Sequence, residues 1–100
     1  MIYHKLVRDR IPDIIAAKGG QAKTHIAAEA EYWLKLKEKL TEEVVEFCQA
    51  ESTEEMADIQ EVLNAIYEFK NFTPAAIETF RLKKAQQRGG FSQRIILDES

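Results

Sequence analysis

Cysteine is almost absent from this chain of 100 residues, since Cys48 is the only one. A single cysteine excludes an internal disulfide and a zinc site built from several thiolates, and it fits a reducing compartment. Cys48 itself is expected to be a small core residue of a helix. Two prolines and four glycines, with 45% hydrophobic and 31% charged residues, indicate a folded protein rather than a disordered one. A single domain spanning residues 1–100 is expected.

Long apolar runs are also missing. Charged residues interrupt every apolar stretch of the N-terminal sequence MIYHKLVRDRIPDII, so it predicts neither a signal peptide nor a membrane span. The expected location is the cytoplasm, without a membrane partner. The chain has 14 basic and 17 acidic residues, a net charge of -3, which gives no support to a nucleic-acid polymer as partner.

The spacing of apolar residues predicts an all-α fold with a four-helix core. A short helix follows Asp9, which is expected to cap it, and ends at Gly19-Gly20. A long amphipathic helix is predicted from about Ala27 to Ala50, with an apolar stripe at intervals of three and four residues: Trp33, Leu36, Leu40, Val44 and Phe47.

A third helix is expected to begin at Ser52 or Thr53 and to pack antiparallel to the second, because the turn between them is short. Its apolar positions are Met56, Ile59, Leu63 and Ile66. Thr73-Pro74 starts a fourth helix, which Gly89-Gly90 stops. Short extended segments are expected at Ile2–Val7, Gln21–Ile26 and Phe91–Leu97, and the last of these is a candidate to pair with the residues near Lys23 to Ile26.

Acidic residues gather on the facing flanks of the two central helices. In Glu42-Glu43-Val44-Val45-Glu46 the carboxylates lie on one side of the helix, and Glu55 and Asp58 are one turn apart on the next. Several anions in a partly dry place repel one another unless a cation lies among them. Oxygen ligands without histidine or cysteine favour Mg²⁺, with Mn²⁺ as a possible substitute.

Each acidic residue also has an interpretation that needs no metal. Glu42 can pair with Lys39 or remain solvated, and Glu55 can complete a capping box that Ser52 begins. Asp58 can interact favourably with the dipole of its own helix. The spacing therefore makes a metal site plausible without identifying it.

The order of these motifs resembles the all-alpha nucleotide pyrophosphohydrolases, the superfamily of MazG and phosphoribosyl-ATP pyrophosphohydrolase. The resemblance rests on Glu42-Glu43-x-x-Glu46 and Glu55-x-x-Asp58, and extends to Lys5–Pro12 and Arg88–Phe91. It implies a MazG-like four-helix core and a homodimer or homotetramer. It also implies magnesium-dependent cleavage between the alpha and beta phosphates of a nucleotide, which gives a nucleoside monophosphate and pyrophosphate.

Carried over by motif, the metal ligands are Glu43, Glu46, Glu55 and Asp58, with Glu42 either a ligand or an outer carboxylate. One carboxylate not fully occupied by metal can accept a proton from water; Glu43 and Glu46 are the candidates, and the spacing does not choose between them. Basic residues near the two ends of the chain are candidate phosphate ligands: Lys5, Arg8, Arg10, Lys83, Lys84 and Arg88. The alternative is a non-catalytic nucleotide-binding protein or a dimeric helical interaction module.

Overall fold

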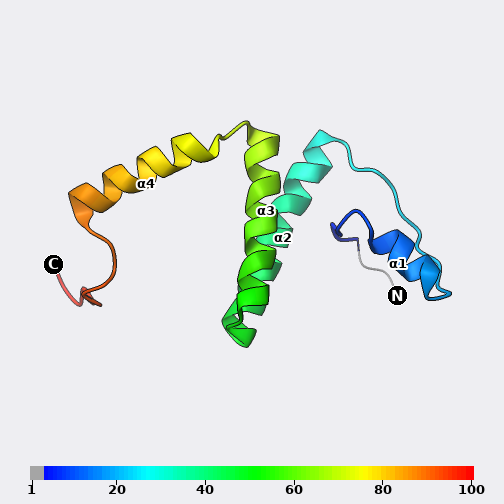
Figure 1. The fold of residues 1–100 in the computed structure, drawn as a ribbon, viewed down its shortest axis with the longest axis horizontal. Helices are drawn as coiled ribbons and strands as arrows, with labels where there is room; N and C mark the ends of the chain where they lie inside the picture. The colour runs from blue at the N-terminus through cyan, green and yellow to red at the C-terminus, as the bar shows by residue number, and fades with distance from the viewer. Residues whose placement is uncertain (1–3) are drawn as a thin grey trace.

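A computed structural model describes residues 4–100 and contains four helices in chain order, α1 (Ile11–Ala17), α2 (Glu29–Ala50), α3 (Thr53–Lys70) and α4 (Pro74–Arg88) (Figure 1). No strand forms anywhere in residues 4–100, so the prediction of an all-α fold with four helices is confirmed. Of the extended segment predicted at Ile2–Val7, residues 2 and 3 lie outside the described range.

An antiparallel hairpin of α2 and α3 forms the centre of the molecule (Figure 1). The chain reverses within two residues: Glu51 takes a left-handed conformation with φ 51° and donates its backbone N–H to the Phe47 carbonyl oxygen. Ser52 then caps α3, because its Oγ accepts a hydrogen bond from the backbone N–H of Glu55 at 3.2 Å. The short turn forces the two helices to pack along their length.

The hydrophobic core lies within this hairpin. Leu36 of α2 is 1% exposed and packs with Val62 and Ile66 of α3. At the open end of the hairpin the rings of Trp33 and Phe69 stack with centroids 5.8 Å apart. Two positions of the predicted apolar stripes, Val44 and Met56, are instead more than 40% exposed. Cys48, expected in the core, is exposed as well.

The helix ends follow the predicted signals at three places. Thr73 caps α4, since its Oγ1 accepts from the backbone N–H of Ala76 at 3.1 Å. Gly19, with φ 85°, follows α1, and Gly89 ends α4. The expected cap of α1 was wrong: the N-cap residue is Arg10, and it makes no side-chain capping hydrogen bond within the described chain. Asp9 is thereby left available to the cavity described below.

Helix α4 and the tail after it extend away from the hairpin (Figure 1). Within residues 4–100, α2 and α3 are the only helices that pack extensively against each other. The predicted pairing between the residues near Lys23 to Ile26 and the tail is wrong, because the two segments lie on opposite sides of the hairpin (Figure 1). The radius of gyration is 17.9 Å, against about 13 Å for a compact chain of this length.

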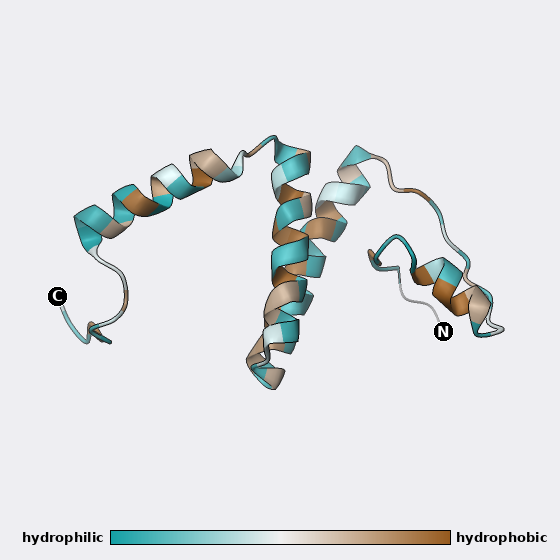
Figure 2. Cartoon of the chain, in the orientation of Figure 1, coloured by the Kyte–Doolittle hydropathy of each residue, from teal (hydrophilic) through white to brown (hydrophobic). Residues whose placement is uncertain are grey.

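Many large apolar side chains therefore face solvent in the single chain. Hydrophobic residues recur along α4 and in the segments beyond the hairpin (Figure 2). Phe80 is 69% exposed, and four tail residues are at least 78% exposed: Phe91, Ile95, Ile96 and Leu97. In the part of the chain that is described, no helix combines the length and apolar character that crossing a membrane requires.

Candidate functional site

Three carboxylates converge where α2 and α3 face each other. Glu43 comes from α2, and Glu55 and Asp58 come from the first turns of α3. One carboxylate oxygen from each residue lies within 4.8 Å of the other two. The spacing of three residues brings Glu55 and Asp58 to one side of α3, and the hairpin brings Glu43 to the same place.

Two oxygens of this cluster are buried without compensation. The Glu43 side chain is only 8% exposed, and neither its Oε2 nor the Oε2 of Glu55 has a hydrogen-bond partner in the described part of the protein. A buried carboxylate oxygen without a partner is costly, and a hard divalent cation would satisfy it. The three residues thus have the donor chemistry that magnesium binding requires.

Glu55 uses its backbone, and not its carboxylate, in the cap of α3. The Ser52 Oγ accepts from Glu55 N, while Glu55 Oε2 remains buried and unpaired. The capping box considered from the sequence would direct the Glu55 carboxylate back to the Ser52 backbone N–H, but no such bond forms in residues 4–100. The cap and a metal-binding role for the carboxylate are therefore compatible.

Lys39 is the cation closest to Glu43. Its Nζ lies 3.3 Å from Glu43 Oε1 and 3.4 Å from Glu42 Oε2, and its side chain is only 17% exposed. Burial raises the pKa of Glu43 above its ordinary value; Lys39 opposes that rise, and the neighbouring Glu46 carboxylate adds to it. The lysine offsets only part of the cost of burying the Glu43 charge.

The other two acidic candidates lie beside the cluster rather than in it. Glu42 faces the basic side, where its Oε1 lies 3.5 Å from Lys5 Nζ and its Oε2 contacts Lys39. Glu46 is half-buried and close enough to Glu43 to affect its pKa. The structure thus brings three of the five predicted metal ligands together, and places Glu42 and Glu46 at the edge.

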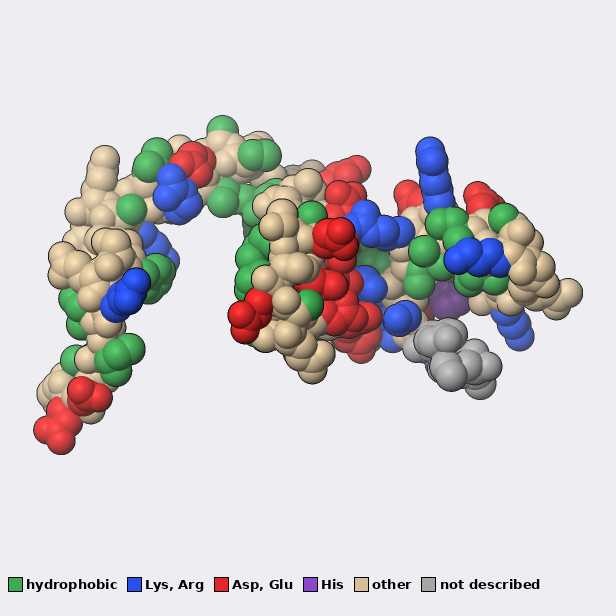
Figure 3. Space-filling model, turned by 60° about the horizontal axis from the view of Figure 1, so that its bottom comes forward, with side chains coloured by type: hydrophobic (Ala, Val, Ile, Leu, Met, Phe, Trp, Pro, Cys, Tyr) green, Lys and Arg blue, Asp and Glu red, His purple; other side chains and the backbone are tan. Residues whose placement is uncertain are grey.

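The segment before α1 supplies cations to this acidic face. Arg8 Nη2 lies 2.8 Å from Asp58 Oδ1, and Lys5 contacts Glu42 as described above. Acidic side chains gather along the hairpin, with basic side chains beside them (Figure 3). Two of the predicted phosphate ligands are therefore already next to the carboxylates.

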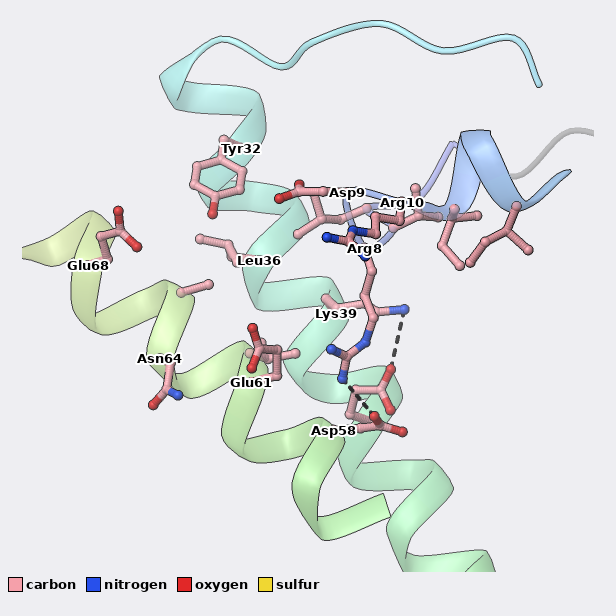
Figure 4. Close-up of a pocket in the computed structure, with 17 residues that line it drawn as sticks. Arg8, Asp9, Arg10, Tyr32, Leu36, Lys39, Asp58, Glu61, Asn64 and Glu68 are labelled. Atoms are coloured by element: carbon pink, nitrogen blue, oxygen red, sulfur yellow. Dashed lines mark hydrogen bonds and ion pairs between the residues drawn. The ribbon is translucent and has the colours of Figure 1, made fainter. Parts of the chain in front are cut away.

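A cavity of about 540 Å³ opens between this segment, α1 and the hairpin (Figure 4). Glu43 and Asp58 line it together with Arg8, Arg10 and Lys39. The remaining polar lining consists of residues that the motifs did not single out as a site: Asp9, Tyr32, Glu61, Asn64 and Glu68. Apolar residues complete the wall: Leu6, Val7, Ile11, Ile14, Leu36, Val62 and Ala65.

The basic residues of α4 are not brought to this cavity within one chain. Lys83, Lys84 and Arg88 are exposed on a helix that extends away from the hairpin (Figure 1). Lys39, by contrast, is expected from the sequence only as a partner for Glu42. Its position four residues before Glu43, one helical turn away, is the signal that indicates its contact with the cluster.

Comparison of the chain with protein-family models, curated proteins and solved structures found no significant match.

Proposed function

We propose that the protein is a magnesium-dependent nucleotide pyrophosphohydrolase. The observation that carries this proposal is the pair of buried, unpartnered carboxylate oxygens of Glu43 and Glu55 beside Asp58. They lie at one end of a cavity that is also lined by Arg and Lys side chains. Anionic oxygens favour a hard divalent ion, and Arg and Lys donors favour phosphate oxygens. A substrate with a chain of phosphates matches both.

Glu43, Glu55 and Asp58 would hold Mg²⁺, or Mn²⁺ in its place. The ion would supply Lewis-acid stabilisation of negative charge on the phosphates and would favour ionisation of water. Glu46 is the proton acceptor in this proposal, because it lies beside the three-carboxylate cluster without belonging to it. Arg8, Arg10 and Lys39 orient the phosphates through charged hydrogen bonds.

The reaction adds water across the bond between the alpha and beta phosphates. Oxygen from water forms a bond to phosphorus, the bridging phosphoanhydride bond breaks, and the proton removed from water passes to Glu46. The products are a nucleoside monophosphate and pyrophosphate.

We further propose that the protein acts in the cytoplasm as a homodimer or homotetramer. Its radius of gyration exceeds that of a compact chain, and α4 exposes Phe80. Burying such apolar surface against another copy would release about 25 cal/mol for each square ångström removed from water. An oligomer also gives Lys83, Lys84 and Arg88 a route to the site of another copy, which they lack within their own chain.

The test is release of pyrophosphate from a panel of ribonucleoside and deoxyribonucleoside triphosphates, with magnesium and with EDTA. Glu46→Gln and Asp58→Asn should each lower kcat by about a hundredfold or more. Glu54→Gln is the matched control, because Glu54 is exposed in the first turn of α3 and lies outside the cluster. Its activity should equal that of the wild type.

Absence of magnesium-dependent pyrophosphate from every nucleotide would refute the enzymatic proposal. Unchanged turnover in both Glu46→Gln and Asp58→Asn would refute the assigned site. Thermal unfolding with magnesium and a non-hydrolysable triphosphate identifies the non-catalytic alternative, in which the nucleotide raises the Tm without any product.

A further inference from the structure

The cavity beside the carboxylate cluster has two ends of different chemistry. Asp58, Arg8 and Lys39 lie toward one end, and Tyr32 and Glu68 lie toward the other (Figure 4). Ten residues of α3 separate Asp58 from Glu68, which corresponds to about 15 Å along the helix axis. The cavity is therefore long enough to hold an extended nucleotide with its phosphates at the first end.

The wall between these ends combines apolar residues with Glu61 and Asn64 (Figure 4). Leu36 and Val62 belong to the buried core and also line the cavity, and Ala65 continues this surface along α3. A flat, weakly hydrated ring buries apolar area against the apolar part of this wall, whereas a phosphate would lose hydration without compensation. The middle of the cavity suits the ring of a nucleobase or the carbon face of a ribose.

The far end consists of Tyr32 with two carboxylates, Asp9 and Glu68. Burial raises the pKa of Tyr32, and the charges of Glu68 and Asp9 raise it further, so all three groups lie within electrostatic range. Neither carboxylate forms a side-chain hydrogen bond or ion pair with another of residues 4–100. An ionised carboxylate accepts hydrogen bonds and donates none, so these two groups are open to donors of a ligand.

We propose that Asp9 and Glu68 select nucleotides whose nucleoside part presents neutral hydrogen-bond donors, either an exocyclic amino group of the base or ribose hydroxyls. This inference rests on the proposed function, because it assigns the phosphates to the opposite end. The same two carboxylates repel phosphates, and so they also set the direction in which a nucleotide enters. Glu43 lines the same cavity, and its Oε2 is buried without a partner. This carboxylate marks the end at which the metal ion and the phosphates would bind.

The experiment compares kcat/KM within pairs of nucleotides that differ in one donor. GTP and ITP differ in the 2-amino group of the purine, ATP and purine riboside triphosphate in the 6-amino group, and ATP and dATP in the ribose 2′-hydroxyl. The wild type should prefer the member with the additional donor by about tenfold in at least one kind of pair. The nucleotide pairs that differ in the base test the exocyclic amino group, and the pair that differs in the sugar tests the ribose hydroxyl.

Glu68→Gln and Asp9→Asn preserve side-chain size but replace an acceptor by an amide, which both accepts and donates. Each variant should lower the preference ratio at least threefold. The ratio should fall because kcat/KM for the favoured nucleotide decreases more than kcat/KM for the other member of the pair. Glu31→Gln is the control, because Glu31 bonds to His25 outside the cavity, and its ratios should not change.

Three outcomes would overturn the inference alone: wild-type ratios close to one, ratios identical in the wild type and both variants, or an equal loss of kcat/KM for every nucleotide. In each of these outcomes the wild type still releases pyrophosphate, so the proposed function stands. If the wild type releases none from any nucleotide, the proposed function itself fails. Thermal unfolding of both variants verifies that they fold, and Tyr32→Phe supplies a third variant at the same end.

Discussion

Arg8 and Asp58, fifty positions apart in the chain, form an ion pair with Nη2 and Oδ1 separated by 2.8 Å. The aspartate also belongs to the cluster with Glu43 and Glu55. One carboxylate therefore serves both the N-terminal segment and the proposed metal site. A divalent cation at the cluster would compete with Arg8 for the Asp58 carboxylate.

Replacing Arg8 should change metal binding and substrate binding in opposite directions. In Arg8→Ala the competing guanidinium is lost, so Mg²⁺ should bind a few times more tightly in the absence of nucleotide, as expected for a half-exposed ion pair. The KM for a triphosphate should rise by about tenfold because a phosphate donor is missing. Isothermal titration with Mg²⁺ and steady-state kinetics measure the two effects. Arg81→Ala, which removes an exposed ion pair on α4, should affect neither.

Glu43→Gln should stabilise the metal-free protein at neutral pH while abolishing metal-dependent activity. The folded-state pKa of Glu43 is raised above its ordinary value of 4.5, mainly by burial. A raised pKa contributes stability that is fully present below the unfolded-state value and is lost as pH rises through the folded-state value. In EDTA, the free energy of unfolding of the variant should therefore exceed that of the wild type by about 1 kcal/mol at pH 7.5. At pH 4 the variant should have no such advantage.

Urea denaturation at the two pH values gives this comparison, with Glu54→Gln as the exposed control. A variant that is less stable than the wild type at pH 7.5 would contradict the assignment of Glu43 as a buried, poorly compensated charge.

Ser52 and Glu55 should have separable roles in stability and activity. Ser52→Ala removes the Oγ that accepts from Glu55 N, and it should lower the free energy of unfolding by about 1 kcal/mol with kcat nearly unchanged. Glu55→Gln keeps the backbone donor of that bond, and it should lower kcat by about a hundredfold with little loss of stability. Chemical denaturation and pyrophosphate release compare the two variants. Equal losses of stability in both would mean that the Glu55 carboxylate serves the cap.

Phe80 should contribute to assembly. It is 69% exposed on α4, and Phe80→Asp places a charge where an oligomer would bury an aromatic ring. The variant should sediment as a smaller species than the wild type at the same concentration. Gln86→Asp, an exposed polar position on the same helix, is the control and should leave the sedimentation coefficient unchanged. A wild type that sediments as a monomer would contradict the proposed oligomer.

The helices and most of their capping residues were predictable because they depend on residues close in sequence. Ser52 and Thr73 act as caps through bonds to a backbone N–H three residues later, and Gly19 accepts a positive φ without a Cβ penalty. The meeting of Glu55 and Asp58 was also predictable, since one helical turn separates them. The cap of α1 was not predictable in this way, because Arg10 occupies the N-cap position and Asp9 lines the cavity.

Contacts between distant segments could not be derived from spacing. Which residues of the apolar stripes become buried depends on how the two helices cross, and this is why Val44 and Met56 are exposed while Val62 is buried. The ion pair of Arg8 with Asp58 depends on the path of the chain through α1 and the loop before α2.

Local sequence determined four helices, most of their ends and two groups of carboxylates, because backbone hydrogen bonding and helical periodicity act over a few residues. Only the tertiary structure decided that Glu43, Glu55 and Asp58 form one cluster, that Glu42 faces Lys5 and Lys39 instead, and that α4 stands away from the hairpin. How deeply a carboxylate is buried, and which cations lie beside it, depend on every segment that packs around it. The role of each carboxylate is therefore decided by its neighbours in space.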